Sequence, residues 1–477
     1  MKAVKDHLLS GGAVPEMKKG NAKLAAAIAE TGWSHAQVAR AFVRVAKESK
    51  ACEFGAVGRS HVSHWVGGSK PSGRAPVILC EALSRRLGRL MTLGEIGLSI
   101  TPSMSQDALG WRLDTLTALT DLGRLDVDLE RRRVLGAAIY SVAALALPND
   151  RWWAQMAGGT NPAHTRGMPR VGRGDVEAVR DMVSVFSRID QRRGGGHART
   201  AVVQYLTTDV ARYLRGSFAD DRVRREMYSA ASELAYLSGW MAFDSSEHAI
   251  AQRYFAVAIK LAAEADDPPM AGHVLRAMAH QALDLGHSQQ AMELATASMD
   301  GQRYAMASPR ERALLGVVYA RGLTATRQER AAATALVRAE DDLAAAGPGD
   351  AEPGRVFFFG EASLAHETAC ALRDSGDLAG AVREFRRSVR ARKAATFTRT
   401  HCVTLGYLGA IQAHQGGTEE ACATWSAALD AMDGIRSGRT RQVAIDMRSV
   451  LSPFRSLGIR AVGDLDARAA THLAGVT

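Results

Sequence analysis

The chain has 477 residues, and at about 100–200 residues per domain this length allows roughly three folded units. Hydrophobic residues make up 47% and charged residues 23%, a composition that supports packed cores and argues against wholesale disorder. Aromatic residues make up only 6%, and the long runs are rich in Ala, Leu, Arg and Glu, which favours helices. The sequence therefore predicts an all-α protein.

The net charge of +10 is concentrated near the start of the chain. Residues 1–100 carry fifteen Lys and Arg against seven Asp and Glu, a net charge of +8, so the remaining residues supply only +2. A basic segment joined to a near-neutral remainder indicates a polyanionic partner for the segment, and nucleic acid is the commonest such partner.

The cysteines and the apolar runs bear on the compartment. The five cysteines are odd in number and show no CxxC spacing, which argues against a disulfide framework and a zinc knuckle. Residues 1–20 contain four lysines but no apolar signal core. The apolar run 134–147 is shorter than the ~20 residues that a membrane-spanning helix needs. We expect a cytoplasmic, nucleoid-associated protein without a membrane partner.

The N-terminal hundred residues read as a series of short helices. Asn21 can cap a first helix, which Gly32 ends. Ser34 and Gln37 have the spacing of a capping box, and they predict a second helix that runs toward Ser49. After a long connection, further helices are predicted over Arg59–Val66 and Pro76–Leu90. A small polar helix in third place is typical of a helix-turn-helix domain.

The third helix has the pattern of a recognition helix. Val62, Trp65 and Val66 share one apolar face, which can fix the helix while its polar residues reach base edges in the major groove. The predicted base contacts are Arg59, Ser60, His61, Ser63 and His64, and the predicted phosphate contacts are Gln37, Lys70, Arg74, Arg85 and Arg86. His61 and His64 lack a nearby carboxylate or thiol, so we expect no metal there. The alternative is a helical bundle whose charges are merely solvated.

The middle of the chain contains the boundaries. Thr101–Gln106 is small and polar, and Trp111–Leu125 and Asp126–Leu147 read as two helices. Gly158–Gly174 is rich in Gly and Pro and reads as a long loop, and beyond Asp175 we expect helices and no strand. The predicted domains are a DNA-binding domain over 1–100, a linker over 101–174 and a repeat domain over 175–477.

The C-terminal part repeats. The alanines at 251, 291, 332, 381 and 421 are separated by 40, 41, 49 and 40 residues, and Gly376 and Gly416 each precede an aromatic residue by nine. A repeated helix pair needs a small residue where its helices cross and a large one in the next groove, which is the tetratricopeptide pattern. We predict a superhelix of about five helix pairs over roughly 228–435, capped by a helix around Val443–Leu451 that Pro453 ends. An unrelated helical bundle is the alternative.

These motifs carry a family resemblance. Trp33–Ala39 and Gly58–Pro71 resemble the Xre-type helix-turn-helix of actinobacterial regulators, with a longer connection, 47–57, than that motif usually has. The segments 194–199, 239–244, 251–255 and 279–286 resemble the tetratricopeptide-repeat domain of such regulators. The resemblance implies negative regulation of differentiation and antibiotic production, as in streptomycetes. The architecture is also similar to that of peptide-sensing regulators of other Gram-positive bacteria.

No enzyme motif stands out. The phosphate loop GxxxxGK[ST], HExxH and GxSxG are all missing from the sequence, and we expect neither catalysis nor a cofactor. Gly194, Gly195 and Gly196, followed by His197 and Arg199, form a candidate anion or effector site, although a flexible turn before a helix over Thr200–Leu214 explains them better. Three histidines recur every seven residues and are expected to be repeat-packing or groove residues rather than metal ligands: His273, His280 and His287.

The sequence therefore predicts a transcriptional regulator, with repression of development or secondary metabolism as its implied role. Double-stranded DNA is the expected partner of the N-terminal domain. The repeat domain is expected to make a homodimer and to bind a peptide, a small molecule or a protein in its groove. The alternative function is a protein-interaction scaffold with little or no DNA binding.

Overall fold

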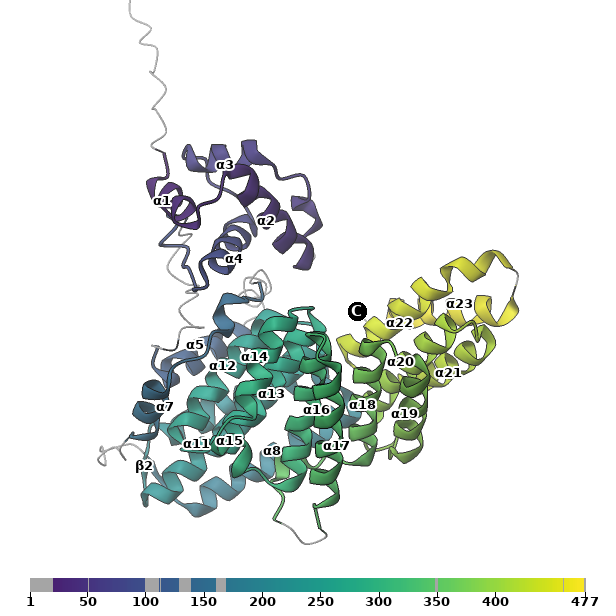
Figure 1. Cartoon of the computed structure of the whole chain (residues 1–477). Helices are drawn as coiled ribbons and strands as arrows, with labels where there is room; N and C mark the ends of the chain where they lie inside the picture. Colours follow the sequence, from purple (N-terminus) through teal and green to yellow (C-terminus); the bar gives the residue numbers. More distant parts are fainter. Residues whose placement is uncertain are drawn as a thin grey trace, which may run out of the picture. The chain divides into compact units, whose positions relative to one another are not determined.

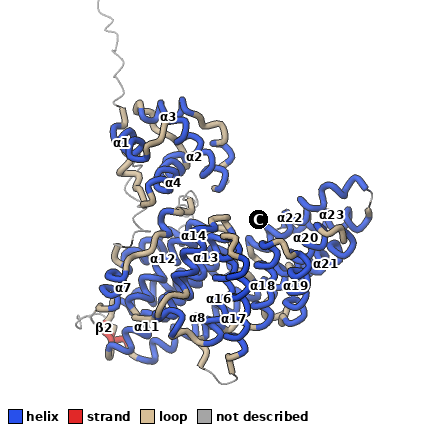
Figure 2. The backbone as a smooth tube through the Cα atoms, viewed as in Figure 1, coloured by secondary structure: helices blue, strands red, loops and turns tan. Residues whose placement is uncertain are grey.

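The computed structural model describes residues 20–49, 51–98, 111, 113–127, 139–159, 169–347, 351–457 and 459–475. The chain separates into two compact units, Met1–Gln106 and Asp107–Thr477, which we call the head and the body (Figure 1). Helices account for the regular structure of the described residues, apart from two short strands (Figure 2). These strands, β1 (Arg170–Val171) and β2 (Ser217–Phe218), pair in parallel. The all-α prediction is confirmed, and β2 corrects the expectation of no strand beyond residue 175.

The head contains four α-helices and one 3-10 turn: α1 (Ala22–Thr31), α2 (His35–Glu48), η1 (Cys52–Phe54), α3 (Arg59–Val66) and α4 (Ala75–Leu87). The capping predictions are confirmed. The Asn21 side chain accepts from Leu24 N, Gly32 ends α1 in the left-handed conformation, and Ser34 and Gln37 form the capping box of α2. The fourth helix ends at Gly88, earlier than predicted, because Gly88 adopts the left-handed conformation that terminates helices.

The long connection between α2 and α3 is part of the head's core. Its 3-10 turn carries Phe54, whose ring packs edge-on against Phe42 of α2 at 5.8 Å. The ring of Trp65 in α3 also packs against Phe42, with the ring centroids 5.3 Å apart. Phe42 is fully buried, so α2, the connection and α3 share one aromatic cluster.

The body begins with irregular and helical segments that precede the repeats: α5 (Thr115–Val127), η3 (Ala143–Leu145), α7 (Asp150–Ala157), α8 (Arg173–Arg193), α9 (Gly195–Tyr205), a π-helical turn η4 (Leu206–Val210) and α10 (Ala211–Leu214). The predicted helix over Asp126–Leu147 is wrong in its C-terminal part, because residues 139–147 contain only η3. Residues 128–138 of that prediction lie outside the described residues.

Antiparallel helix pairs follow in succession. They are α11 (Asp221–Asp244) with α12 (His248–Glu264), α13 (Pro268–Asp284) with α14 (Ser288–Ser298), α16 (Pro309–Ala325) with α17 (Glu329–Ala344), α18 (Glu361–Ser375) with α19 (Leu378–Ala391), and α20 (Thr398–His414) with α21 (Thr418–Ala431). A short α15 (Gln302–Ala305) and the turn η5 (Gly354–Val356) lie in the connections. Five pairs over 221–431 confirm the predicted helical-repeat architecture, and their succession can be followed in Figure 1.

The C-terminal end of the body consists of two helices rather than the single capping helix that the sequence predicted. The helix α22 (Gly438–Leu451) is joined through η6 (Ser452–Leu457) to α23 (Arg460–Gly475), and these two helices pack on each other and on the last pair. Their apolar residues, such as Val462 and Leu465, belong to the same buried cluster as Trp425. The predicted single cap is therefore corrected to a sixth helix pair. Among the described residues, no helix is long and apolar enough to cross a membrane.

The repeat period is set by the turn inside each pair. One residue of every such turn has a positive φ, and these residues are Ser246 (63°), Gly286 (78°), Arg327 (64°), Gly376 (95°) and Gly416 (86°). Each of the five alanines identified in the sequence lies five residues later, and all five are buried. The unequal spacing of 49 residues arises where the connection between α17 and α18 is longer.

The close approach of the two helices in a pair explains why a small residue on one faces a large residue on the other. A Cβ on Gly239 would lie 2.8 Å from the Phe255 ring, and a Cβ on Gly409 would lie 2.6 Å from the Trp425 ring. In both pairs the glycine is on the first helix and the aromatic residue on the second. The aromatic ring therefore packs directly on the backbone of its partner helix, which only glycine permits.

Candidate functional site

The third helix of the head has an exposed polar face and a buried apolar face. Val62 is fully buried and Trp65 is 8% exposed, whereas Arg59, Ser60, His61 and His64 are exposed. The helix begins and ends where the sequence predicted, since Gly67 follows its last residue. Four of the five residues predicted to contact bases thus lie on the solvent side of a short helix.

Two hydrogen bonds fix this helix. Ser63, the fifth predicted base contact, is half-buried, and its Oγ lies 2.9 Å from Nδ1 of His35 at the start of α2. The backbone N–H of Gly58 donates to Nδ1 of His61 at 3.2 Å, so in the neutral ring the proton is on Nε2. Ser63 is therefore a link between α2 and α3.

The glutamates of the head are paired with two arginines. Arg85 lies 2.7 Å from Glu81 and 2.5 Å from Glu48, and Arg89 lies 3.1 Å from Glu30 and 2.9 Å from Glu95. These four are all the described glutamates of the head except Glu53. Arg85 was predicted to contact phosphate, but two carboxylates already neutralise it.

Seven exposed cations of the head make no ion pair with a described residue. Lys23 and Arg86 donate to backbone carbonyls, and the other five are Arg40, Arg44, Lys47, Arg59 and Lys70. Arg40, Arg44 and Lys47 follow one another at i, i+4 and i+7 on α2, which places them on one helix face. The sequence analysis missed these three, although their spacing was visible. Because four of the five described glutamates are paired with Arg85 and Arg89, the positive charge of α2 and α3 remains available to a polyanion.

The remaining predicted phosphate contacts are partly engaged. Gln37 accepts from the backbone of Ser34 in the capping box. Arg74 donates to Ser49 O at 3.2 Å, and Arg86 donates to Thr31 O while lying 5.6 Å from the Trp33 ring. Arg86 is exposed and Arg74 is half-buried, so Lys70 is the freest of the predicted set.

The glycine-rich motif of the body is held by internal partners. Gly195 N donates to Asp244 Oδ2 at 2.9 Å, and Gly196 N donates to Arg436 O at 3.0 Å. A Cβ on Gly195 would lie 2.5 Å from Met241 O, so glycine allows this contact. Helix α9 begins at Gly195 and not at Thr200, because the Asp244 carboxylate satisfies its first N–H.

The cation of that motif is also occupied. Arg199 is 3% exposed and lies 2.5 Å from Asp126 and 2.6 Å from Glu247. His197 is exposed. The anions that this motif binds in the structure are therefore carboxylates of the chain itself.

Two of the three spaced histidines lie inside the repeat packing. His273 and His280 are buried on α13, and burial lowers the pKa of His273 to about 4. Its Nδ1 lies 3.2 Å from Glu311 Oε1, whereas the ring of His287 stacks on Tyr140 at 5.6 Å. The described residues contain no cluster of His, Cys, Asp and Glu that could hold a metal ion.

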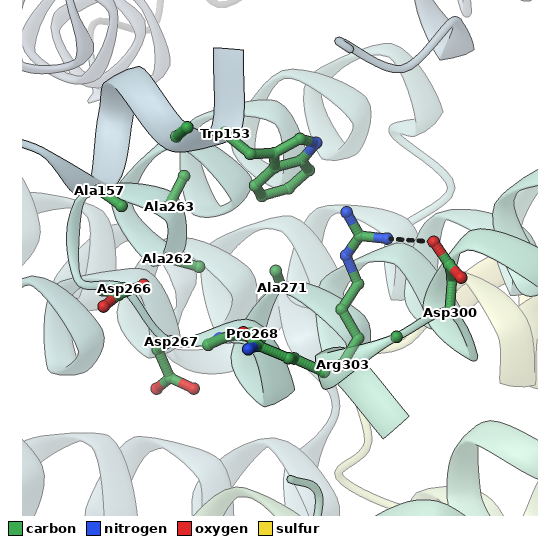
Figure 3. A pocket seen from close by; sticks show the side chains of 13 residues that line it. Trp153, Ala157, Ala262, Ala263, Asp266, Asp267, Pro268, Ala271, Asp300 and Arg303 are labelled. Atoms are coloured by element: carbon green, nitrogen blue, oxygen red, sulfur yellow. Dashed lines mark ion pairs between the residues drawn. The ribbon is translucent and has the colours of Figure 1, made fainter. Parts of the chain in front are cut away.

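A cavity of about 280 Å³ lies between α7, the turn before α13 and α15 (Figure 3). The Arg303 guanidinium lies 4.7 Å from the Trp153 ring and 3.7 Å from Asp300, so this cation is already stacked and paired. Asp266 and Asp267 line the same cavity, and Asp267 accepts from the Ser229 hydroxyl at 2.7 Å. The cavity is roomy, but Arg303 and Asp267 are engaged within the chain and Asp266 is exposed to solvent.

Comparison with known proteins finds similarity to a family model and to a solved structure. The family model of the SP15 N-terminal domain matches residues 24–99, which lie in the head. A solved structure titled "Crystal Structure of Rap Protein Complexed with Competence and Sporulation Factor" is similar over 63% of this chain and 98% of that chain, with 12% identity and a TM-score of 0.38. No curated protein matches the chain. The resemblance to Xre-type domains stays a prediction.

Proposed function

We propose that the chain is a DNA-binding transcriptional regulator. The observation that carries the proposal is the charge arrangement of the head, in which four glutamates neutralise Arg85 and Arg89 while the cations of α2 and α3 stay unpaired among the described residues. Such a surface fits a polyanion with regularly spaced charges, such as the phosphates of duplex DNA. Binding is favoured because duplex DNA releases counterions when these side chains contact its phosphates.

The head residues take different roles in this proposal. Arg59 is exposed at the first turn of α3, where its planar guanidinium can make two hydrogen bonds to guanine. Ser60, His61 and His64 flank it on the same exposed helix. Arg40, Arg44, Lys47 and Lys70 would contact phosphates, which position the head without reading sequence.

The body would supply dimerisation and effector or partner binding, with no catalytic step. One eight-residue helix offers few base contacts, so a second head spaced about 34 Å away would be needed for a regulatory affinity. We expect a two-subunit mass by light scattering and a pseudo-palindromic operator. Repression of development or secondary metabolism is the direction that the family resemblance implies.

Chromatin immunoprecipitation with sequencing tests the proposal in the cell. The wild-type chain should enrich discrete sites that share a motif, and Arg59→Ala should lose most of that enrichment. Arg89→Ala is the matched control, because it removes one positive charge that Glu30 and Glu95 already neutralise. Uniform background for the wild type would leave the protein-interaction scaffold as the function of the chain.

A further inference from the structure

The interior of the repeats contains a second cavity, of about 60 Å³, which we call the arginine pocket. Its lining comes from the first helices of successive pairs, α11, α13, α16, α18, α20 and α22, together with α8, the end of α19 and the Phe358–Phe359 segment. Four arginines line it: Arg276, Arg392, Arg399 and Arg439. Glu367 is the acidic residue in this lining.

Two of these arginines are balanced by carboxylates. Arg399 lies 3.0 Å from Asp190 and 3.1 Å from Asp244, and Arg439 lies 3.5 Å from Asp284. The neighbouring Arg321 lies 2.9 Å from Glu367 and 3.6 Å from Asp284. The carboxylates around the pocket are thus committed to these three cations.

The other two arginines have no carboxylate within ion-pair distance among the described residues. Arg276 is 2% exposed; it donates to Tyr236 Oη at 3.0 Å and lies 5.5 Å from the Trp240 ring. Arg392 is 7% exposed and donates to Ala362 O at 2.8 Å and to Ser388 Oγ at 3.1 Å. The Nε of each is buried and has no hydrogen-bond partner.

Burying a cation without a counterion is costly, and an anion that enters the pocket would offset that cost. Burial lowers the pKa of Arg392 to about 10, which still leaves it charged at neutral pH. His280 and His366, which also line the pocket, have pKa values far below the usual range because they are buried, so they are neutral donors or acceptors there. The uncompensated charge of the pocket therefore comes from Arg276 and Arg392.

We propose that the arginine pocket binds an oxyanion group of a ligand, a carboxylate or a phosphate, with Arg276 and Arg392 as its counterions. A volume of about 60 Å³ is roughly that of two water molecules, so only the anionic head of a ligand enters. A neighbouring cavity of about 30 Å³ shares Gln191, Trp240 and Phe358 with it, and it is too small to take more than an atom or two beyond the anionic head. The inference deepens the proposed function by locating an effector site.

Thermal unfolding of the full chain tests the site with defined probes. Inorganic phosphate, glutarate and the peptide acetyl-Ala-Glu-Ala-amide are titrated at constant ionic strength, with sodium chloride and acetyl-Ala-Gln-Ala-amide as controls. At least one oxyanion should raise the Tm saturably by a few degrees, because a ligand that binds only the folded state stabilises it by mass action. The probe that acts identifies the source, a free phosphate, a small dicarboxylate or an acidic peptide.

Variants locate the effect. Arg276→Gln and Arg392→Gln should abolish the shift, whereas Arg386→Gln, which removes an exposed arginine of α19 paired with Glu420, should keep it. Without ligand, Arg392→Gln should not lower the Tm, because it removes an uncompensated charge, and this readout does not depend on the choice of probe. No shift with any oxyanion, or equal shifts in all variants, would overturn the proposal. DNA binding by the same samples is measured separately, so the failure of one proposal is distinguishable from the failure of the other.

Discussion

The head and the body use arginine in opposite ways. In the head, exposed cations on α2 and α3 make no ion pair with a described residue, while Arg85 and Arg89 pair with four of the five described glutamates. In the body, many arginines are buried and joined to carboxylates from other helices, as Arg355 is to Glu311 at 2.7 Å. The comparison teaches that the pairing of charges, and not their number, distinguishes a surface for a polyanion from an interior network.

The body's networks should be far more sensitive to truncation than its surface pairs. Arg399→Ala leaves Asp190 and Asp244, both 1% exposed or less, without their cation. We expect a loss of about 3–5 kcal/mol in the free energy of unfolding, measured with urea. Arg386→Ala, which breaks an exposed pair, should cost at most about 1 kcal/mol. Similar losses for both variants would show that burial does not set the difference.

Acid should destabilise the body through the His273–Glu311 pair. Burial lowers the pKa of His273 from its ordinary 6.5 to about 4 in the folded state. The contribution of this shift to the free energy of unfolding is therefore fully present above about pH 6.5 and is lost as the pH falls toward 4. Glu311 is buried, but the neighbouring Arg355 lowers its pKa to about 2. Its contribution to the free energy of unfolding is present above about pH 4.5 and also falls on acidification. Unfolding of the full chain between pH 7 and pH 4 should show a loss of up to about 3 kcal/mol from His273.

A variant isolates the histidine's share of this loss. His273→Gln cannot take up a proton in the unfolded chain, so its unfolding free energy should change less between pH 7 and pH 4 than that of the wild type. An unchanged pH profile in the variant would assign the acid sensitivity to other groups.

Substitutions of two head cations should have different effects on DNA binding. Arg59→Ala should cost about 1–3 kcal/mol and relax preference at one base, whereas Lys70→Ala should weaken all sequences alike and reduce the salt slope by about one. Fluorescence anisotropy on specific and random duplexes measures both effects. Arg89→Ala should change neither quantity, because Glu30 and Glu95 neutralise that side chain. Equal, sequence-independent losses for Arg59 and Lys70 would remove α3 as the reading helix.

The smallest predicted effect concerns the repeat turns. Arg327 has a φ of 64°, a conformation that costs a residue with a side chain roughly 1 kcal/mol, so Arg327→Gly should raise the free energy of unfolding by about that amount. Gly376→Ala is the matched reverse change, since its φ is 95° and a Cβ there would meet no atom within 4 Å. A loss of stability in Arg327→Gly would show that its side chain contributes more than its strain.

Local signals in the sequence predicted the head well. The bounds of α3 follow from Gly58 and Gly67 on either side, and the start of α2 follows from the Ser34 capping box, because caps act within four residues. The repeat alanines were visible for the same reason, although Ser246 and Arg327 replace glycine in two turns and so obscure the period.

Long-range pairing could not be predicted in this way. Glu48 meets Arg85 across 37 residues, and Gly195 meets Asp244 across 49, so neither the freed cations of α2 nor the internal occupancy of the glycine motif has a local signature. The unpaired Arg276 and Arg392 are likewise recognised only when every carboxylate around them has been assigned. The α23 helix was missed because its apolar stripe is short and follows Pro453.

The most direct test compares the two units on one duplex. Residues 1–106 and residues 107–477 are titrated separately against the same DNA from 50 to 300 mM salt. We predict that the head fragment binds at low salt and loses affinity linearly in log–log form, with a slope that reports several phosphate contacts, while the body fragment shows no salt-dependent binding. A folded head fragment without binding at 50 mM salt, or a body fragment that binds as strongly as the head, would contradict the account.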